Sequence, residues 1–199
     1  MCALNEVKGM NLIMNNNLYL KYPSMDDYEE WIRYTNEYFD KNSNCVVSGF
    51  AKNTDYKEWL NRINNERNGI LEKDRVPASF YFMMNDDEIV GCISIRHNLN
   101  TDFLRRFGGH IGYNVRPSER GKGYGTKMLY LALFKCEELG LSDVMISCKK
   151  NNIASAKVIE NNGGKLQDEV FIPEEDDIFR IYWVNVYESF LKNDIGKTI

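Results

Sequence analysis

The sequence has few cysteines, no long apolar run and no excess of basic residues. The five cysteines are scattered and form no C-x-x-C pair: Cys2, Cys45, Cys92, Cys136 and Cys148. Neither a disulfide framework nor a zinc ribbon is therefore expected. No apolar run approaches the roughly 20 residues of a membrane-spanning helix. Residues 1–17 lack the basic region and apolar stretch of a secretory signal, so we expect a cytoplasmic protein with no membrane partner.

The charge balance argues against a nucleic-acid-binding protein. Twenty-nine acidic residues face 25 basic ones, a net charge of -4, whereas binding to phosphates needs a basic face. With 43% hydrophobic and 27% charged residues among 199, the chain has the composition of an ordinary globular protein. No repeat or linker divides it. We expect one domain over residues 18–190, a tail over 191–199, and an N-terminal segment, 1–17, whose order the sequence leaves open.

Hydrophobic periodicity predicts a mixed α/β domain, because segments with a helical period alternate with short β-type runs. In chain order we expect a strand at Leu18–Tyr22, helices at Asp27–Phe39 and Thr54–Arg67, a hairpin of Ala78–Met84 and Ile89–Ile95, a loop at His97–Gly109, a strand at His110–Val115, a helix at Thr126–Leu139, a strand at Asp143–Cys148, a helix at Asn152–Asn162, and strands at Leu166–Ile172 and Ile178–Val186. This order predicts an antiparallel half and one β-α-β crossover.

A glycine-rich segment, Arg116-Pro-Ser-Glu-Arg-Gly-Lys-Gly-Tyr-Gly-Thr126, lies between an expected strand and an expected helix. Backbone N–H groups freed by Gly121, Gly123 and Gly125 can face one concavity at the helix N-terminus, which suits a pyrophosphate. Arg120 and Lys122 add cationic donors. The segment is neither a Walker A loop nor the dinucleotide fingerprint, because its glycine spacing differs from both. A flexible, solvated turn remains the alternative.

The segment resembles the Q/R-x-x-G-x-G/A signature of the GCN5-related N-acetyltransferases, the GNAT superfamily. A second element of that family follows in order, as Asn152-x-x-Ser155 and then Glu160-x-x-Gly163. The resemblance extends over residues 18–190, and its motifs lie within 91–166.

This resemblance implies a GNAT-type α/β fold: a central, mostly antiparallel sheet with flanking helices and two splayed parallel strands, here His110–Val115 and Val144–Cys148. It implies acetyl-CoA as acetyl donor and no metal. The pantetheine would be held by strand groups, and the pyrophosphate by the glycine-rich loop. The residues it assigns to the cofactor are Tyr113, Asn114, Val115, Arg120, Gly121, Lys122, Gly123, Tyr124, Gly125, Thr126, Asn152 and Ser155.

The catalytic groups that the resemblance implies depart from the commonest pattern of the family. Many relatives carry a proton-donating Tyr seven residues after the Asn, but here that position is Ile159. Ser155 matches the Ser that the ribosomal-protein N-acetyltransferases carry, so we expect Ser155 to protonate the leaving thiolate, with Asn152 beside it. The alternative is that Asn152 is only a helix cap and Ser155 a polar residue of the first turn.

His110 is the expected general base, because a pKa near 6.5 suits proton removal from an amine. A strand histidine without a catalytic role, with water as the base, is the alternative. The acidic run Glu174–Asp177 would attract a cationic amine or form a solvated turn. The helix aromatics Tyr28, Trp31, Tyr34 and Tyr38 would line the acceptor cleft or pack in the core.

The function expected is direct transfer of an acetyl group to a primary amine. The acceptor would be a small molecule or a peptide, and the enzyme a monomer or homodimer. A non-catalytic module that binds acyl-CoA is the competing hypothesis, because the usual Tyr and Glu of the family are missing. A nucleotide-binding domain is disfavoured by the glycine spacing.

Overall fold

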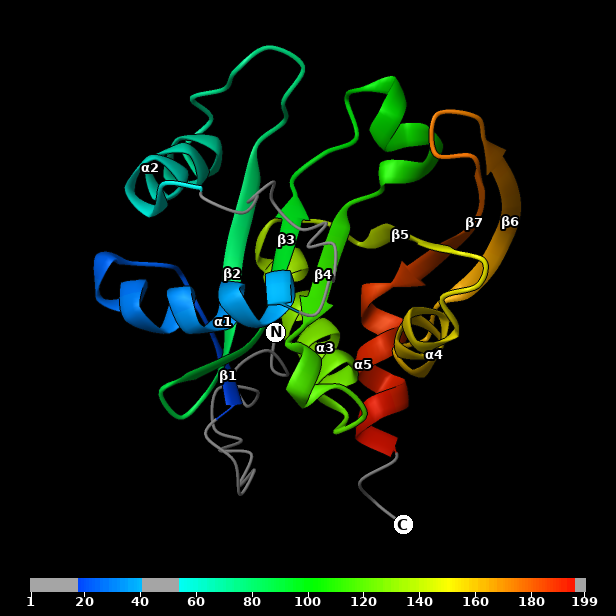
Figure 1. Ribbon diagram of the computed structural model, residues 1–199. Coiled ribbons are helices and arrows are strands. Elements are labelled where there is room, and N and C mark those ends of the chain that lie inside the picture. Colours follow the sequence, from blue (N-terminus) through cyan, green and yellow to red (C-terminus); the bar gives the residue numbers. More distant parts are fainter. Residues whose placement is uncertain (1–17, 41–53, 196–199) are drawn as a thin grey trace, which may run out of the picture.

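The computed structural model describes residues 18–40 and 54–195, and residues 1–17 lie outside this part of the chain. Its elements form two antiparallel sheets with helices on their faces (Figure 1). The first half comprises β1 (Leu18–Lys21), η2 (Met25–Asp27), α1 (Tyr28–Asp40), α2 (Tyr56–Arg67), β2 (Ala78–Asn85), β3 (Glu88–Arg96), η3 (Leu104–Gly108), β4 (Ile111–Val115) and η4 (Pro117–Glu119). The second half comprises α3 (Tyr124–Glu138), β5 (Asp143–Lys149), α4 (Ile153–Asn161), β6 (Lys165–Ile172), β7 (Asp177–Asn185) and α5 (Val186–Ile195).

The first sheet has the strand order β1-β2-β3-β4 and is covered on both faces. Alternate residues of β2 divide between two cores, since neighbouring side chains in a strand point to opposite faces. Phe80 and Phe82 pack with the aromatic residues of α1 and α2, whereas Tyr81 and Met83 pack in the core that includes α3. The predicted hairpin, Ala78–Met84 with Ile89–Ile95, is confirmed by the register of β2 and β3.

The second sheet has the order β5-β7-β6. Its strand β5 lies beside β4, the last strand of the first sheet (Figure 1). α3 connects β4 to β5, the crossover type of connection that joins parallel strands. In the part of the chain that the structure describes, β4 pairs only with β3 and β5 only with β7. The two strands meet at one point, where the N–H of His110 donates to the carbonyl of Met145 at 2.8 Å. The predicted pair of splayed strands is therefore present.

Some boundaries differ from those expected. α3 begins at Tyr124, two residues before the predicted start, and the loop 97–109 contains the π-helical turn η3. The chain expected as the end of a strand and a C-terminal tail forms α5, which runs from Val186 to Ile195. The helix begins there because the side chain of Asn185 accepts from the N–H of Glu188 at 3.0 Å. Phe190 then stacks on Phe134 of α3, with ring centroids 4.3 Å apart.

Two further properties concern the described residues as a set. None of their helices is long and apolar enough to cross a membrane. No group of three or more His, Cys, Asp or Glu side chains among residues 18–40 and 54–195 lies close enough together to hold a metal ion.

Candidate active site

The opening between β4 and β5 leaves backbone groups of β4 without a strand neighbour. Arg96 donates its N–H to the carbonyl of His110, and Arg116 donates to Val90, so the even-numbered positions of β4 face β3. Because backbone direction alternates along a strand, the groups of Tyr113 and Val115 face the opening. Of the three positions predicted to bind pantetheine, these two lie on the free edge. Asn114 does not, because its backbone turns toward β3 and its side-chain carbonyl accepts from Tyr34 and Cys92.

The glycine-rich loop ends at a helix terminus that no side chain caps. Gly121 and Gly123 have positive φ angles of 81° and 84°, and a Cβ at either position would meet no atom within 4 Å. Gly123 is the N-cap residue of α3, and it provides no side-chain hydrogen bond. In α2 and α4, by contrast, Asp55 and Asn152 cap the first turn. Exposed N–H groups at a bare helix N-terminus suit an anion, so this loop fits a pyrophosphate.

The other predicted loop residues divide between binding and packing positions. Lys122 is exposed and pairs with Glu119 at 2.8 Å, and Arg120 donates from Nε to the carbonyl of Val115 at 3.3 Å. Gly125 is buried, and a Cβ there would lie 3.1 Å from Val158 of α4. This third glycine therefore permits close packing of α3 on α4.

Tyr124 and Thr126 form the first turn of α3. Tyr124 packs against the core that α3 shares with the sheets. The carbonyl of Thr126 accepts from the amide of Asn162 at 3.1 Å. These contacts fix the start of the helix next to the loop.

Helix α1 holds the start of the loop, a feature that the sequence analysis did not predict. Glu37 accepts from the backbone N–H and the hydroxyl of Ser118, at 2.6 and 3.0 Å, and from Nε of Arg116 at 2.7 Å. Glu30 accepts from Nη1 of the same arginine at 2.8 Å. Tyr38 donates to the carbonyl of Val115. No local sequence signal links these residues, because the partners are about 80 positions apart.

Ser155 of α4 contacts Tyr113 of β4. The Tyr113 hydroxyl lies 2.8 Å from Oγ of Ser155 and donates to the Ser155 carbonyl at 3.3 Å. Burial raises the pKa of the Tyr113 phenol above its ordinary range, so the phenol stays protonated at neutral pH. Burial also raises the pKa of the Cys148 thiol, although the Ser155 hydroxyl lowers it in part. Three groups that can hold protons thus converge from β4, β5 and α4.

Asn152 acts as the N-cap of α4. Its Oδ1 accepts from the N–H of Ser155 at 3.1 Å. This is the capping geometry that the sequence analysis kept as an alternative to a catalytic role. The cap fixes the first turn of α4 and thereby the position of Ser155.

His110 has a geometry that does not fit the general base expected of it. It is only 6% exposed, and its Nδ1 accepts from the N–H of Met145 at 3.0 Å. Burial and the nearby Arg96 lower its pKa to about 4. The imidazole is therefore neutral with its proton on Nε2, and its basic lone pair is already used. We correct the expectation: His110 joins β4 to β5.

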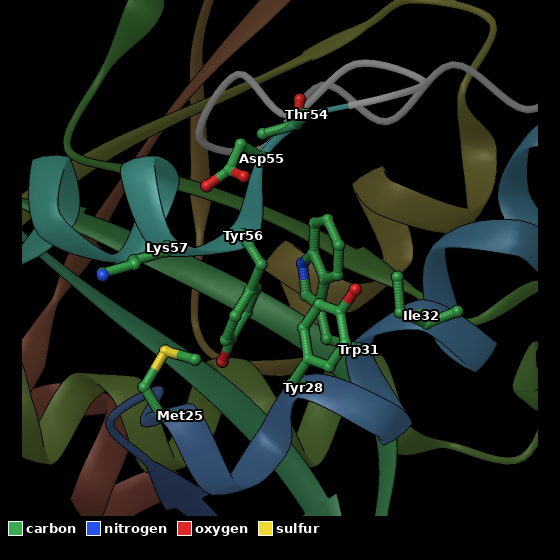
Figure 2. Close-up of a pocket in the computed structure, with 8 residues that line it drawn as sticks. All are labelled: Met25, Tyr28, Trp31, Ile32, Thr54, Asp55, Tyr56 and Lys57. Atoms are coloured by element: carbon green, nitrogen blue, oxygen red, sulfur yellow. The ribbon is translucent and has the colours of Figure 1, made fainter.

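The helix aromatics expected at the acceptor cleft divide into two groups. Tyr34 and Tyr38 are fully buried and point to β4. Tyr28 and Trp31 line a separate pocket of about 450 Å³ with Tyr56 and the first residues of α2, which Figure 2 shows. Trp31 and Tyr56 lie there with ring centroids 4.8 Å apart.

The acidic run Glu174–Asp177 forms the exposed turn between β6 and β7. Asp176 has a positive φ of 48°, and the turn closes with the N–H of Glu175 donating to Ile172 at 3.1 Å. Lys149, at the end of β5, lies 3.3 Å from Asp177. The run is thus solvated and partly neutralised by neighbouring cations.

Comparison with known proteins agrees with this geometry. Residues 17–165 match the family model described as the acetyltransferase (GNAT) domain. No curated protein sequence matches the chain. Similar solved structures include RimJ of Mycobacterium smegmatis in complex with CoA-disulfide, which is 16% identical with a TM-score of 0.68. The match covers 90% of this chain and 89% of that one.

Two further similar structures are acetyltransferases. One is the Salmonella typhimurium acetyl transferase that modifies the N-terminal serine of ribosomal protein L7/L12 (16% identity, TM-score 0.63, covering 84% of this chain and 94% of that one). The other is a chimera of the Vibrio cholerae spermidine N-acetyltransferase SpeG and hSSAT (12% identity, TM-score 0.58, covering 87% of this chain and 98% of that one). These likenesses show the fold, and the family model covers most of the chain. The chain therefore belongs to the GNAT family of acetyltransferases, whose acetyl donor is acetyl-CoA.

Proposed function

We propose that the protein transfers an acetyl group from acetyl-CoA directly to a primary amine. The observation that carries this proposal is the junction of three features in one opening. They are the free edge of β4, the uncapped N-terminus of α3 and the Tyr113–Ser155 pair. A thioester held along such an edge would have its phosphates at the glycine-rich loop and its sulfur at the other end, near the two hydroxyl groups.

The loop would bind the pyrophosphate through the N–H groups around Gly121 and Gly123. Lys122 and Arg120 add positive charge at the mouth, and the field of the α3 N-terminus favours an anion. Glu37 fixes the start of the loop through Ser118, so less conformational entropy is lost when the ligand binds.

The N–H groups and carbonyls on the free edge of β4 would bind the pantetheine amides. The carbonyl of Val115 already accepts from Tyr38 and Arg120. The groups of Tyr113 face the opening, and a ligand amide can satisfy them as a neighbouring strand would.

Acetyl-CoA supplies a thioester whose carbonyl carbon the amine attacks. Ser155 would donate its hydroxyl proton to the departing sulfur and take up the proton that the nitrogen of the tetrahedral intermediate loses, and the protonated Tyr113 would stabilise the serine oxygen by a hydrogen bond. With His110 unsuited as a base, water would remove the proton from the acceptor ammonium. The three free, buried cysteines, Cys92, Cys136 and Cys148, are consistent with a reducing cytoplasm as the location.

The proposal is tested by following thiol release from acetyl-CoA with a panel of primary amines. The panel holds a polyamine, amino acids and peptides with a free N-terminus. We expect stoichiometric acetyl-amine for at least one acceptor class. If the protein binds CoA and releases no thiol with any of them, it is a binding module and the proposed reaction is wrong.

A further inference from the structure

A second pocket, of about 470 Å³, lies on the α2 side of β2 and β3 and is lined by charged and apolar residues. The apolar lining comes from Val76 and Ala78 on one side and from Phe103 and Leu104 on the other. The polar lining includes Ser94 and Arg96 of β3. This pocket is distinct from the glycine-rich loop and from the aromatic pocket of Figure 2.

Arg96 forms no direct ion pair with a carboxylate of the described residues. Its Nη1 donates to the carbonyls of Gly108 and Gly109, both at 3.0 Å. In the part of the chain that the structure describes, Nε and Nη2 have no hydrogen-bond acceptor and the residue forms no ion pair. Carbonyl oxygens orient a guanidinium but leave its net charge in place.

Two carboxylates line the pocket: Asp74, which is exposed to solvent, and Glu66, which is engaged by two other cations. Oε1 of Glu66 lies 3.2 Å from Nη1 of Arg62 and 3.4 Å from Nη1 of Arg75. Burial and the charge of Arg75 lower the pKa of Arg96, and the charge of Glu66 offsets this only in part. Since a partly buried cation without a counter-ion is costly, an anion entering the pocket would gain the interaction that the fold leaves unused.

The pocket and the opening are connected through the register of β3 and β4. Ser94 pairs with Gly112 of β4 across the sheet, so both positions are on one face. A Cβ at Gly112 would meet no atom within 4 Å, which shows open space on that face. Gly112 directly precedes Tyr113, whose phenol lies on the other face of the sheet and contacts Ser155. Because β4 has no strand neighbour on its free edge, a ligand that lies along this edge can reach the face of Gly112 and extend toward Arg96.

We infer that this pocket binds the carboxylate of the amine acceptor, with Arg96 as the specificity-determining residue. The inference rests on the proposed function. The acceptor class is a primary amine that also bears a carboxylate, either a small amino acid or a peptide. Arg96 would hold the carboxylate through Nε and Nη2 in a bidentate pair, Ser94 would donate a hydroxyl, and the apolar wall would contact the carbon skeleton.

The experiment compares carboxylates with their amides. The probes are γ-aminobutyrate and its amide for the small-molecule source, and alanyl-leucine and its C-terminal amide for the peptide source. In each pair the amine is distant from the changed group. Thiol release gives kcat/KM for each probe, and calorimetry with CoA present gives the binding constant. We expect at least one acid to exceed its amide by about tenfold or more in both measurements.

Arg96→Gln should bring this ratio to about one while leaving acetyl-CoA binding unchanged. Arg62→Gln is the matched control, because Arg62 pairs with Glu66 but does not line the pocket. Should Arg96→Gln not fold, Ser94→Leu fills the pocket beside Arg96 and should abolish the same preference.

The two proposals fail in different ways. Turnover without preference for the acid in either pair, or a preference unchanged in both Arg96→Gln and Ser94→Leu, overturns the carboxylate pocket. Binding that prefers the acid and depends on Arg96, but with no turnover, supports the pocket and contradicts the proposed reaction. Failure of both acids to bind more tightly than their amides also overturns the pocket.

Discussion

At the scale of single residues, we propose that the pair of Tyr113 and Ser155 supplies the general acid that the chain lacks at Ile159. Ile159 is fully buried and cannot donate a proton. The phenol instead comes from β4 and lies 2.8 Å from the serine oxygen. The hydrogen bond to Tyr113 restricts rotation of the Ser155 hydroxyl, which lowers the entropic cost of proton donation.

Ser155→Ala should reduce kcat by on the order of 10²-fold, as is typical when a general acid is lost. The dissociation constant of acetyl-CoA should change little, because the serine acts on charge that develops in the transition state. Steady-state kinetics and calorimetry measure the two effects. Ser142→Ala, at an exposed serine before β5, is the control. An unchanged kcat with a good acceptor would remove Ser155 from the mechanism.

Tyr113→Phe should reduce kcat roughly tenfold and leave the melting temperature nearly unchanged, because the ring still fills its site while the hydrogen bond to Ser155 is lost. The control is Tyr182→Phe, which removes another phenol that bonds to α4, at Glu160, without touching Ser155. Equal losses in the two variants would mean that the phenols act only on the stability of α4.

At the scale of elements, the start of α3 differs from the starts of α2 and α4. The first turns of those two helices are capped by Asp55 and Asn152, whereas α3 begins at Gly123 with no side-chain cap. An uncapped start leaves N–H groups that a ligand must satisfy. This difference between three helices of one chain supports the proposal that the start of α3 binds the pyrophosphate.

Gly123→Asp should weaken acetyl-CoA binding at least tenfold, because it adds a carboxylate to the anion site and caps the helix internally. The fold should survive, since Asp tolerates the left-handed region and a Cβ there meets no atom. Gly140→Asp is the matched control: Gly140 also has a positive φ, of 76°, and open surroundings, but lies at the other end of α3. Calorimetry on both variants measures the difference. Equal affinities for Gly123→Asp and wild type would contradict the loop assignment.

At the scale of the whole molecule, the two sheets are joined along β4 and β5 by the contacts of His110. Its N–H and Nδ1 bond to the carbonyl and N–H of Met145. Beyond that point, the edge of β4 that faces away from β3 has no strand neighbour among the described residues. The same residue therefore closes the sheet at one end and defines where the opening begins.

This role predicts how stability depends on pH. The pKa of His110 is about 4 in the folded protein and about 6.5 when unfolded. The unfolded chain thus binds the proton first as pH falls. The stabilisation is complete above about pH 6.5 and decreases as pH falls toward 4, by on the order of 3 kcal/mol.

Urea unfolding between pH 7 and pH 4 measures this decrease, and His110→Gln should show a smaller one. Part of the decrease in stability will remain in the variant, because burial also lowers the pKa of His97. If the variant and wild type lose stability in parallel, protonation of His110 does not control acid unfolding. The pH–rate profile of His110→Gln should overlay that of the wild type above pH 6.5, since water is the proposed base.

The elements and the family were predictable because the signals are local. Gly121 and Gly123 mark a turn before a helix, and Asn152 marks a helix start, because turn and cap geometry depend on neighbouring residues. The strands were recognisable from the pattern of apolar residues that burial of one or both faces requires. Element order was confirmed from β1 to β7. The exception was α5, whose first turn depends on Asn185 as a cap and on packing against α3.

The roles of the side chains at the site depend on partners distant in sequence. His110 was predicted as a base because the sequence shows its residue type but not its burial or the N–H of Met145. The Tyr113–Ser155 contact joins positions 42 apart, and the bonds between α1 and the loop join positions about 80 apart. A side chain's protonation and accessibility are set by such neighbours and by burial. Local sequence signals were thus enough to predict the strands and α-helices from β1 to β7, the glycine-rich loop and the family, whereas the accessibility and protonation of the side chains at the site depend on contacts that form only in the folded chain.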